Sequence, residues 1–307
     1  MSQVFVAVDW INLEGRLTAH FSGDPTLQQM LDEELSGGHK VHARTAALLY
    51  GIDPGDAKTH MINLMGEERP AYDGGKRCRH LWHYGGKAKK MSQTFWLPLK
   101  ECERIDAVLT ATHPLVPEWW KALGDEIFGR GVYGCPKCGD ESNTYGQCNA
   151  CSIVSRQSPL RQWLRWDQVP TRKMTTPFGR RRLYLGRRSQ SMNAAISQLP
   201  QSSGASMWYR TLGRLRGRGG WPTPSYPHRI ITGTYDSFVG QCDSDKTEDM
   251  LQWIAWSCEQ PWRELMGKRF PVDGKIGDNW RDYNVKDNPS GLTEVAYTPL
   301  SARWVQV

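Results

Sequence analysis

Two aspartates lie where short apolar runs end or meet. Asp9 follows the run QVFVAV at residues 3–8, and Asp236 separates the two apolar parts of RIITGTYDSFVGQ at residues 229–241. Neighbouring strands can bring two such carboxylates together, and carboxylates are the ligands that hard Mg²⁺ prefers. A lone aspartate is more often a turn or cap residue than a metal ligand. The pair therefore predicts a divalent-cation site only if a wider pattern supports it.

A lysine and a tyrosine occur at helical spacing in a basic segment predicted to be helical from about residue 74 to residue 95. Lys76 and Tyr84 are eight residues apart, which is just over two helical turns, so both side chains can face the same side. A lysine placed in this way can stabilise negative charge on a phosphate group. The alternative interpretation is a basic amphipathic helix on the surface of any soluble protein.

Four of the eight cysteines form two CxxC pairs separated by nine residues. This spacing is typical of a tetrahedral thiolate site in a reducing compartment. It predicts a structural Zn²⁺ ion, because a catalytic zinc keeps one coordination position open. The spacing leaves two alternatives equally open: the module contacts DNA, or it is a metal-stabilised loop without DNA contact. The four predicted zinc ligands are Cys135, Cys138, Cys148 and Cys151.

Positive charge is in excess and is clustered along the chain. The 307 residues contain 39 Lys and Arg against 32 Asp and Glu, a formal net charge of +7. Clustered cations favour a polyanionic partner, because each neutralised phosphate releases counterions. Any single cluster can equally be solvated surface, but three clusters favour nucleic acid. They are Lys87, Lys89 and Lys90; Arg180, Arg181, Arg182, Arg187 and Arg188; and Arg210, Arg214, Arg216 and Arg218.

The composition excludes several classes of protein. Hydrophobic residues make up 39% and charged residues 23% of the chain, as in soluble globular proteins. No run approaches the ~18 apolar residues of a membrane span, and the first residues lack the features of a signal peptide. We therefore predict a cytoplasmic protein without a membrane partner.

The elements that must position these residues alternate between strands and helices. An apolar, β-branched strand over residues 3–8 precedes Asp9, and a strand–turn–strand hairpin at 229–241 holds Asp236. Helices are predicted within 98–128, over 191–215 and over about 246–261. This order predicts an α+β fold.

Three motifs in order resemble those of family A, the DNA polymerase I-like DNA polymerases. Residues 9–16 (DWINLEGR) resemble the first palm motif D-Y-S-x-I-E-x-R. Residues 76–85 (KRCRHLWHYG) resemble the O-helix motif K-x-x-x-F-x-x-x-Y-G of the fingers, and residues 234–237 (TYDS) resemble the hairpin motif V-H-D-E. The resemblance covers about residues 3–283 and is interrupted around the cysteine module.

The resemblance implies a palm with an antiparallel sheet, mostly helical fingers and template-directed addition of deoxynucleotides to a primer 3′ end. It implies two Mg²⁺ ions on Asp9 and Asp236, and a Lys76 that contacts the triphosphate and can protonate its leaving group. Glu14 corresponds to the residue that blocks a ribose 2′-hydroxyl, which argues against the alternative of RNA synthesis. The other implied nucleotide-binding residues are His42, Arg44, His80 and Tyr84, and the implied DNA-binding residues are Gln201, Arg180, Arg181 and Asn193.

The chain departs from the family pattern at five positions. These are His80 for the O-helix aromatic, Tyr72 for an arginine, Asn193 for an arginine, Tyr235 for the hairpin histidine and Ser237 for the glutamate that follows it. The departures lower the expected rate and fidelity. They also keep open a non-catalytic or weakly active DNA-binding subunit derived from a polymerase.

The predicted division is palm for 1–45, fingers for 46–131, a zinc-ribbon-like insertion with the four cysteines for 132–152, a return segment for 153–190 and palm with a C-terminal tail for 191–307. In the family, the exonuclease domain, the thumb and the first palm strands precede the first motif. We therefore expect thumb and exonuclease to be absent from this chain and carried by a separate N-terminal polypeptide, in a split polymerase of phage DNA replication.

Overall fold

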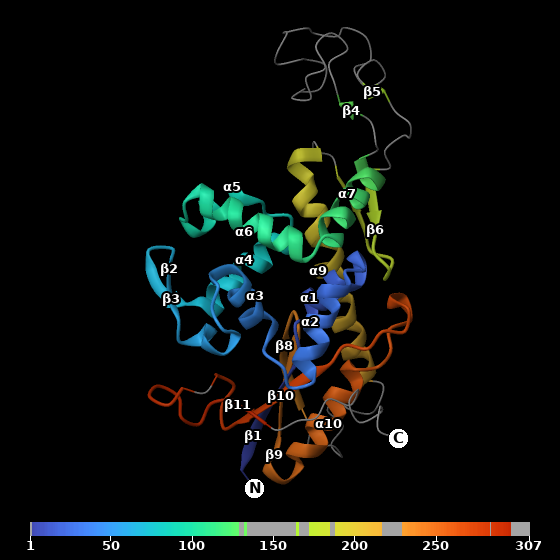
Figure 1. Cartoon of the computed structure of the whole chain (residues 1–307). Coiled ribbons are helices and arrows are strands. Elements are labelled where there is room, and N and C mark those ends of the chain that lie inside the picture. Colours follow the sequence, from blue (N-terminus) through green and yellow to red (C-terminus); the bar gives the residue numbers. More distant parts are fainter. Residues whose placement is uncertain are drawn as a thin grey trace.

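The computed structural model of the chain describes residues 2–128, 132–133, 164–165, 172–184, 188–216, 229–282 and 284–295. The four cysteines of the predicted zinc site lie outside these ranges. The described residues form a five-stranded sheet at one end of the molecule and a group of helices at the other (Figure 1).

The sheet is antiparallel and has the order β11-β10-β1-β9-β8. Its central strand β1 alternates between two environments: Val4, Val6, Val8 and Trp10 are buried on one face, and Asp9 lies on the other. This period of two is what a half-buried strand requires. The strands are β1 (Gln3–Trp10), β8 (Arg229–Thr234), β9 (Ser237–Asp243), β10 (Val272–Gly277) and β11 (Thr293–Glu294).

Two helices cover the apolar face of the sheet. Helix α10 (Thr247–Cys258) packs on β1, β9 and β10, and helix α9 (Arg188–Leu215) packs on α10. Met250, Leu251 and Ile254 of α10 join the valines of β1 in one core. The opposite face, which carries Asp9, is therefore free of these helices.

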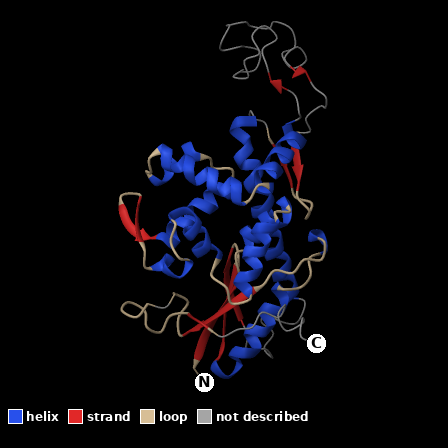
Figure 2. Ribbon diagram, viewed as in Figure 1, coloured by secondary structure: helices blue, strands red, loops and turns tan. Residues whose placement is uncertain are grey.

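The helical part, drawn in blue in Figure 2, is held together by a second core. Its largest fully buried side chain, Trp82, packs edge-on against Trp120 at 4.9 Å between ring centroids. The helices are α1 (Leu13–Ser22), α2 (Pro25–Leu35), α3 (Val41–Tyr50), α4 (Ala71–His83), α5 (Ala88–Phe95), α6 (Leu99–Thr112) and α7 (Leu115–Phe128). Short helices lie at Pro54–Lys58, Ser244–Lys246 and Arg263–Leu265. The two-stranded ladders pair β2 (Met61–Leu64) with β3 (Glu67–Pro70), β4 (Val132–Tyr133) with β5 (Leu164–Arg165), and β6 (Lys173–Thr175) with β7 (Arg181–Leu183).

The predicted α+β class is confirmed, and one predicted element is different. The basic helix expected over about 74–95 is divided into α4 and α5. Gly85 has a φ of +75°, a conformation that residues with a Cβ atom rarely adopt. A side chain at Gly85 would also meet Ile196 and Asn193 of α9 at 2.7 and 3.0 Å. The glycine therefore ends α4 and allows α9 to approach it.

Candidate active site

The two predicted aspartates are neighbours at one end of the sheet. Asp9 is opposite Ser237 in the β1–β9 register, and the Trp10 amide donates a 3.0 Å hydrogen bond to the Asp236 carbonyl. Asp236 occupies the two-residue turn between β8 and β9, which a 2.6 Å hydroxyl contact between Thr234 and Ser237 closes. The register thus brings together two carboxylates that are 227 positions apart in the sequence.

Helix α9 fixes the position of this hairpin. The Tyr235 hydroxyl donates to the Pro200 carbonyl at 3.3 Å, and the Trp208 indole donates to the Ser237 carbonyl at 3.1 Å. Trp208 also stacks on Phe238, with ring centroids 5.3 Å apart and planes 3° from parallel. Asp236 therefore lies on a rigid turn, as a functional side chain that must be accurately placed requires.

A third carboxylate, which the motifs did not identify, lies beside Asp9. Asp273 of β10 is directly opposite Asp9 in the β1–β10 register. Its oxygen Oδ1 and the Oδ1 of Asp9 are buried, and neither has a hydrogen-bond partner among the described residues. The only sequence signal was the alternation around Asp273 in VDGKIG, which its two glycines obscure.

Burial and the charges of neighbouring carboxylates raise the pKa values of the three aspartates. Burial, followed by the charges of Asp236 and Asp273, raises the pKa of Asp9 to about 8. Burial likewise raises the pKa values of Asp236 and Asp273. Like charges crowded in a partly buried site disfavour ionisation. A bound cation relieves this repulsion, so the buried, unpaired oxygens of Asp9 and Asp273 fit a divalent cation.

This crowding predicts that Asp9→Asn stabilises the metal-free protein at pH 8. The folded carboxyl keeps its proton up to a pH of about 8, whereas the unfolded one ionises near its ordinary value of ~3.9. The folded state then binds more protons between these pH values, so its stability falls as the pH rises through that window. At about 1.4 kcal/mol per tenfold difference in proton affinity, the asparagine variant should unfold several degrees higher at pH 8 in EDTA.

The measurement is thermal unfolding at pH 5 and at pH 8, with EDTA and with Mg²⁺. The gain from Asp9→Asn should shrink at pH 5, and Mg²⁺ should raise the unfolding temperature of the wild type but not that of Asp9→Asn. A control, Asp243→Asn at the far end of β9, should behave like the wild type in both respects, since Asp243 contacts Gln3 and leaves Asp9 and Asp236 in place. Equal unfolding temperatures of the wild type and Asp9→Asn at pH 8 in EDTA would contradict a raised pKa of Asp9.

Helix α4 and the residue that caps its C-terminus, Tyr84, bring three predicted site residues toward these carboxylates. His80 Nδ1 is 3.5 Å from Glu14 Oε2. Burial, and after it the Glu14 carboxylate, raise the pKa of Tyr84 above its ordinary range. The positive charges of Lys76 and His80 act to lower the pKa of Asp236, against the larger effect of burial. Lys76 is exposed and forms no ion pair within the described part of the chain. Glu14, Lys76, His80 and Tyr84 thus gather around Asp236.

Helix α3 places His42 against α4. A Cβ atom on Gly75 would come within 2.7 Å of the His42 carbonyl, so this glycine allows the two helices their close approach. The His42 ring lies 5.5 Å from the His80 ring and 5.7 Å from the Tyr72 ring. Burial, with the charges of Arg79, His80 and Lys76, lowers the pKa of His42 to about 2. His42 is therefore neutral at physiological pH and can offer a hydrogen bond without charge.

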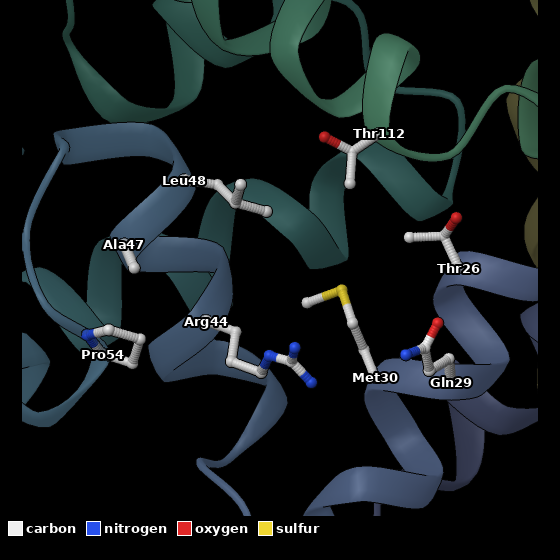
Figure 3. A pocket seen from close by; sticks show the side chains of 8 residues that line it. All are labelled: Thr26, Gln29, Met30, Arg44, Ala47, Leu48, Pro54 and Thr112. Atoms are coloured by element: carbon white, nitrogen blue, oxygen red, sulfur yellow. The ribbon is translucent and has the colours of Figure 1, made fainter.

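Arg44 lies apart from this group. It forms an ion pair with Glu33 of α2. It also lines a mostly apolar pocket of about 410 Å³ between α2, α3 and α6, together with Met30 and Leu48 (Figure 3). Residues two positions apart on a helix point about 200° apart, so Arg44 and the site residue His42 face different ways.

The predicted DNA-binding residues lie in α9 and at the neighbouring β6–β7 hairpin. The Gln201 side chain acts on the pKa of Tyr84, and the Asn193 side chain lies beside Gly85 at the end of α4. Arg180 and Arg181 are exposed at the β6–β7 hairpin. The Arg180 guanidinium stacks 5.4 Å from the Tyr209 ring. The arginines of the hairpin and Tyr209 of α9 thus form one basic and aromatic surface.

The described residues hold no ready-made metal cluster. No three His, Cys, Asp or Glu side chains in these ranges are grouped closely enough to hold a metal ion on their own. A cation at Asp9 and Asp236 would therefore need additional ligands such as water or a bound phosphate. None of the helices in the described part of the chain combines the length and apolarity needed to span a bilayer.

The chain is similar to DNA polymerases in both sequence and structure. It is 29% identical over 128 residues to a thermostable DNA polymerase I from Thermus filiformis, which is 42% of this chain and 14% of that protein. Its structure matches the POL domain of Pol1 from M. smegmatis, solved in complex with DNA primer-template and dNTP. That match has a TM-score of 0.61 at 13% identity and covers 90% of this chain and 40% of the other. No family model matches the chain.

The chain spans less than half of either relative. At this identity the structural match establishes the fold, which includes the antiparallel sheet and the surrounding helices. The resemblance found in the sequence motifs and these two similarities agree. The described chain therefore has the fold of part of a DNA polymerase I polymerase domain.

Proposed function

We propose that this chain is a template-directed DNA polymerase that transfers deoxynucleotides to a primer 3′ end. The observation that carries the proposal is the convergence of Asp9 and Asp236 with Lys76 and His80 across two structural units. Carboxylates on one side and cations on the other suit a reaction that joins metal ions to a triphosphate. In this proposal the sheet unit is the palm and the helical unit is the fingers.

In the reaction the primer 3′-oxygen attacks the α-phosphorus, and the bond to the β,γ-pyrophosphate breaks. Asp9 and Asp236 would hold two Mg²⁺ ions, which when bound activate the attacking oxygen and neutralise the leaving group. Lys76 reaches the same region from α4 and would stabilise charge on the leaving pyrophosphate. The rings of His42 and His80 lie 5.5 Å apart beside Lys76, and in this proposal both would contact the triphosphate.

Glu14 and Tyr84 would define the sugar pocket. The charges of Glu14 and Asp236 both act to raise the pKa of Tyr84, and the charge of Glu14 acts to raise that of Asp236. In this proposal the Glu14 side chain would occupy the space that a ribose 2′-hydroxyl needs, so a ribonucleotide would bind less well than a deoxynucleotide. We expect Glu14→Ala to raise ribonucleotide incorporation relative to deoxynucleotide incorporation by about 10²-fold, the scale of roughly 3 kcal/mol.

Single-nucleotide extension with dATP and ATP measures this ratio. A control, Glu34→Ala, removes a carboxylate of α2 that instead accepts a hydrogen bond from Asn12 and should leave the discrimination unchanged. An unaltered ratio in Glu14→Ala would place the sugar discrimination elsewhere.

Primer extension on a short primed template with Mg²⁺ and deoxynucleotides tests the proposal. Running it with and without an added N-terminal polypeptide that carries a thumb also tests the predicted split enzyme, and the role in phage DNA replication stays a prediction. Zinc at the four cysteines stays a prediction, which metal analysis of the purified chain checks.

The second candidate is a non-catalytic DNA-binding subunit. Ser237 supports it, since the hydroxyl beside Asp9 is held by Thr234 and adds no charge to the site. DNA binding without extension, under every condition of metal and added partner, would favour this candidate.

A further inference from the structure

Asp9 is flanked by one side chain on each neighbouring strand. Asp273 of β10 and Ser237 of β9 are both directly opposite Asp9. Directly opposite residues of antiparallel strands face the same side, with Cβ atoms ~4.5–5.5 Å apart. The three side chains thus form a row across the sheet that ends beside Asp236.

Asp273 forms no ion pair in the described part of the chain. Its buried Oδ1 accepts no hydrogen bond within the described part of the chain. The nearest cation on its strand, Lys275, donates instead to Asp282 at 3.2 Å. Lys40, whose charge also reaches Asp273, lies 3.8 Å from Glu294. A buried carboxylate oxygen without a partner destabilises the fold, so Asp273 is better suited to a ligand than to the protein core.

Ser237 cannot supply a charge to the row. Its hydroxyl contacts Thr234 at 2.6 Å and closes the hairpin turn. Besides Asp236, the carboxylate whose charge acts on Asp9 is Asp273 of β10. Among the described residues, no three acidic side chains are close enough to bind one ion directly, which indicates an indirect contact through water.

We propose that Asp273 is a positioning residue that holds the hydrated divalent cation of Asp9 and Asp236 through a bridging water. The inference rests on the proposed polymerase function and adds a residue outside the three motifs. Carboxylates that hydrogen-bond to ligands or waters of a bound metal orient them and strengthen binding, and their loss costs about 10–100-fold in affinity.

Mn²⁺ binding to the full-length chain tests this role without relying on activity. Mn²⁺ prefers the same carboxylate and water ligands as Mg²⁺, and electron paramagnetic resonance counts its free form. Asp273→Asn should weaken binding by about 10-fold, and Asp9→Asn should weaken it more. Asp243→Asn removes an equal charge from the far end of β9 and should have no effect.

A rescue variant distinguishes the loss of a carboxylate charge from a loss of the folded structure. Ser237→Glu in the Asp273→Asn background restores a carboxylate beside Asp9 from the other strand and should recover most of the affinity. Equal unfolding temperatures in EDTA for Asp273→Asn and the wild type, or a higher one for the variant, would show that the fold is intact.

The outcomes distinguish the two proposals. Weakened binding in Asp9→Asn with wild-type binding in Asp273→Asn would overturn the role of Asp273 and leave the proposed function standing. Binding that is unchanged in Asp9→Asn as well, or undetectable in the wild type, would overturn both. Weakened binding in Asp273→Asn that Ser237→Glu recovers supports the inference.

Discussion

Asp9→Asn and Asp236→Asn should each abolish primer extension, with kcat reduced by about 10³-fold or more. The metal ions of nucleotidyl transfer contribute several kcal/mol of charge stabilisation, and each ~1.4 kcal/mol is worth a factor of ten in rate. Asparagine keeps the shape of the side chain but removes the charge that attracts a divalent ion. The two aspartates lie together at one end of the sheet, so either substitution leaves the metal ions with only one of the two proposed carboxylate ligands.

Single-turnover extension of a labelled primer measures the loss, and electrophoretic mobility shift measures DNA binding. DNA affinity should stay within a few-fold of the wild type, because the basic and aromatic surface of α9 and the β6–β7 hairpin is untouched. Asp243→Asn is the matched control and should extend primers normally. Extension by Asp9→Asn at more than a tenth of the wild-type rate would exclude Asp9 as an essential metal ligand.

The site was predictable where its chemistry depends on local spacing. The strand before Asp9 and the hairpin around Asp236 have apolar runs that sequence patterns identify, and the structure contains both elements. The spacing of Lys76 and Tyr84 indicated one helix face, and in the structure Lys76 lies in α4 while Tyr84 is the residue that caps its end. The sequence did not define the register, and only the register places Asp9 beside Asp236 and Asp273.

Three features depended on tertiary contacts. The break after α4 follows from the positive φ of Gly85 and the approach of α9, neither of which a basic helical pattern records. Strand β10 contains two glycines and a lysine, so its pattern did not distinguish it from a loop. The family resemblance placed Arg44 with His42 near the nucleotide, whereas the side chain of Arg44 forms an ion pair with Glu33 of α2.

Lys76 is the second residue with a large expected effect, and its loss should act on the chemical step. It is exposed, and its charge reaches Asp236 and His42 from α4. We expect Lys76→Met to lower kcat by about 10²–10³-fold, the range seen when one preorganised donor to a developing negative charge is removed. The change in KM should be smaller, because the leaving pyrophosphate gains most of its charge in the transition state.

Arg77→Met is the matched control for Lys76→Met. It removes a neighbouring exposed cation from the same helix, but that guanidinium points toward Met65, 3.9 Å from its sulfur. A general loss of positive potential on α4 would affect both variants, whereas a specific contact with the leaving group affects Lys76 alone. Pre-steady-state incorporation at saturating dNTP measures the chemical step directly. If Lys76→Met raised KM and left that step unchanged, Lys76 would bind the ground-state triphosphate, and charge stabilisation in the transition state would have to come from His42, His80 or the metal ions.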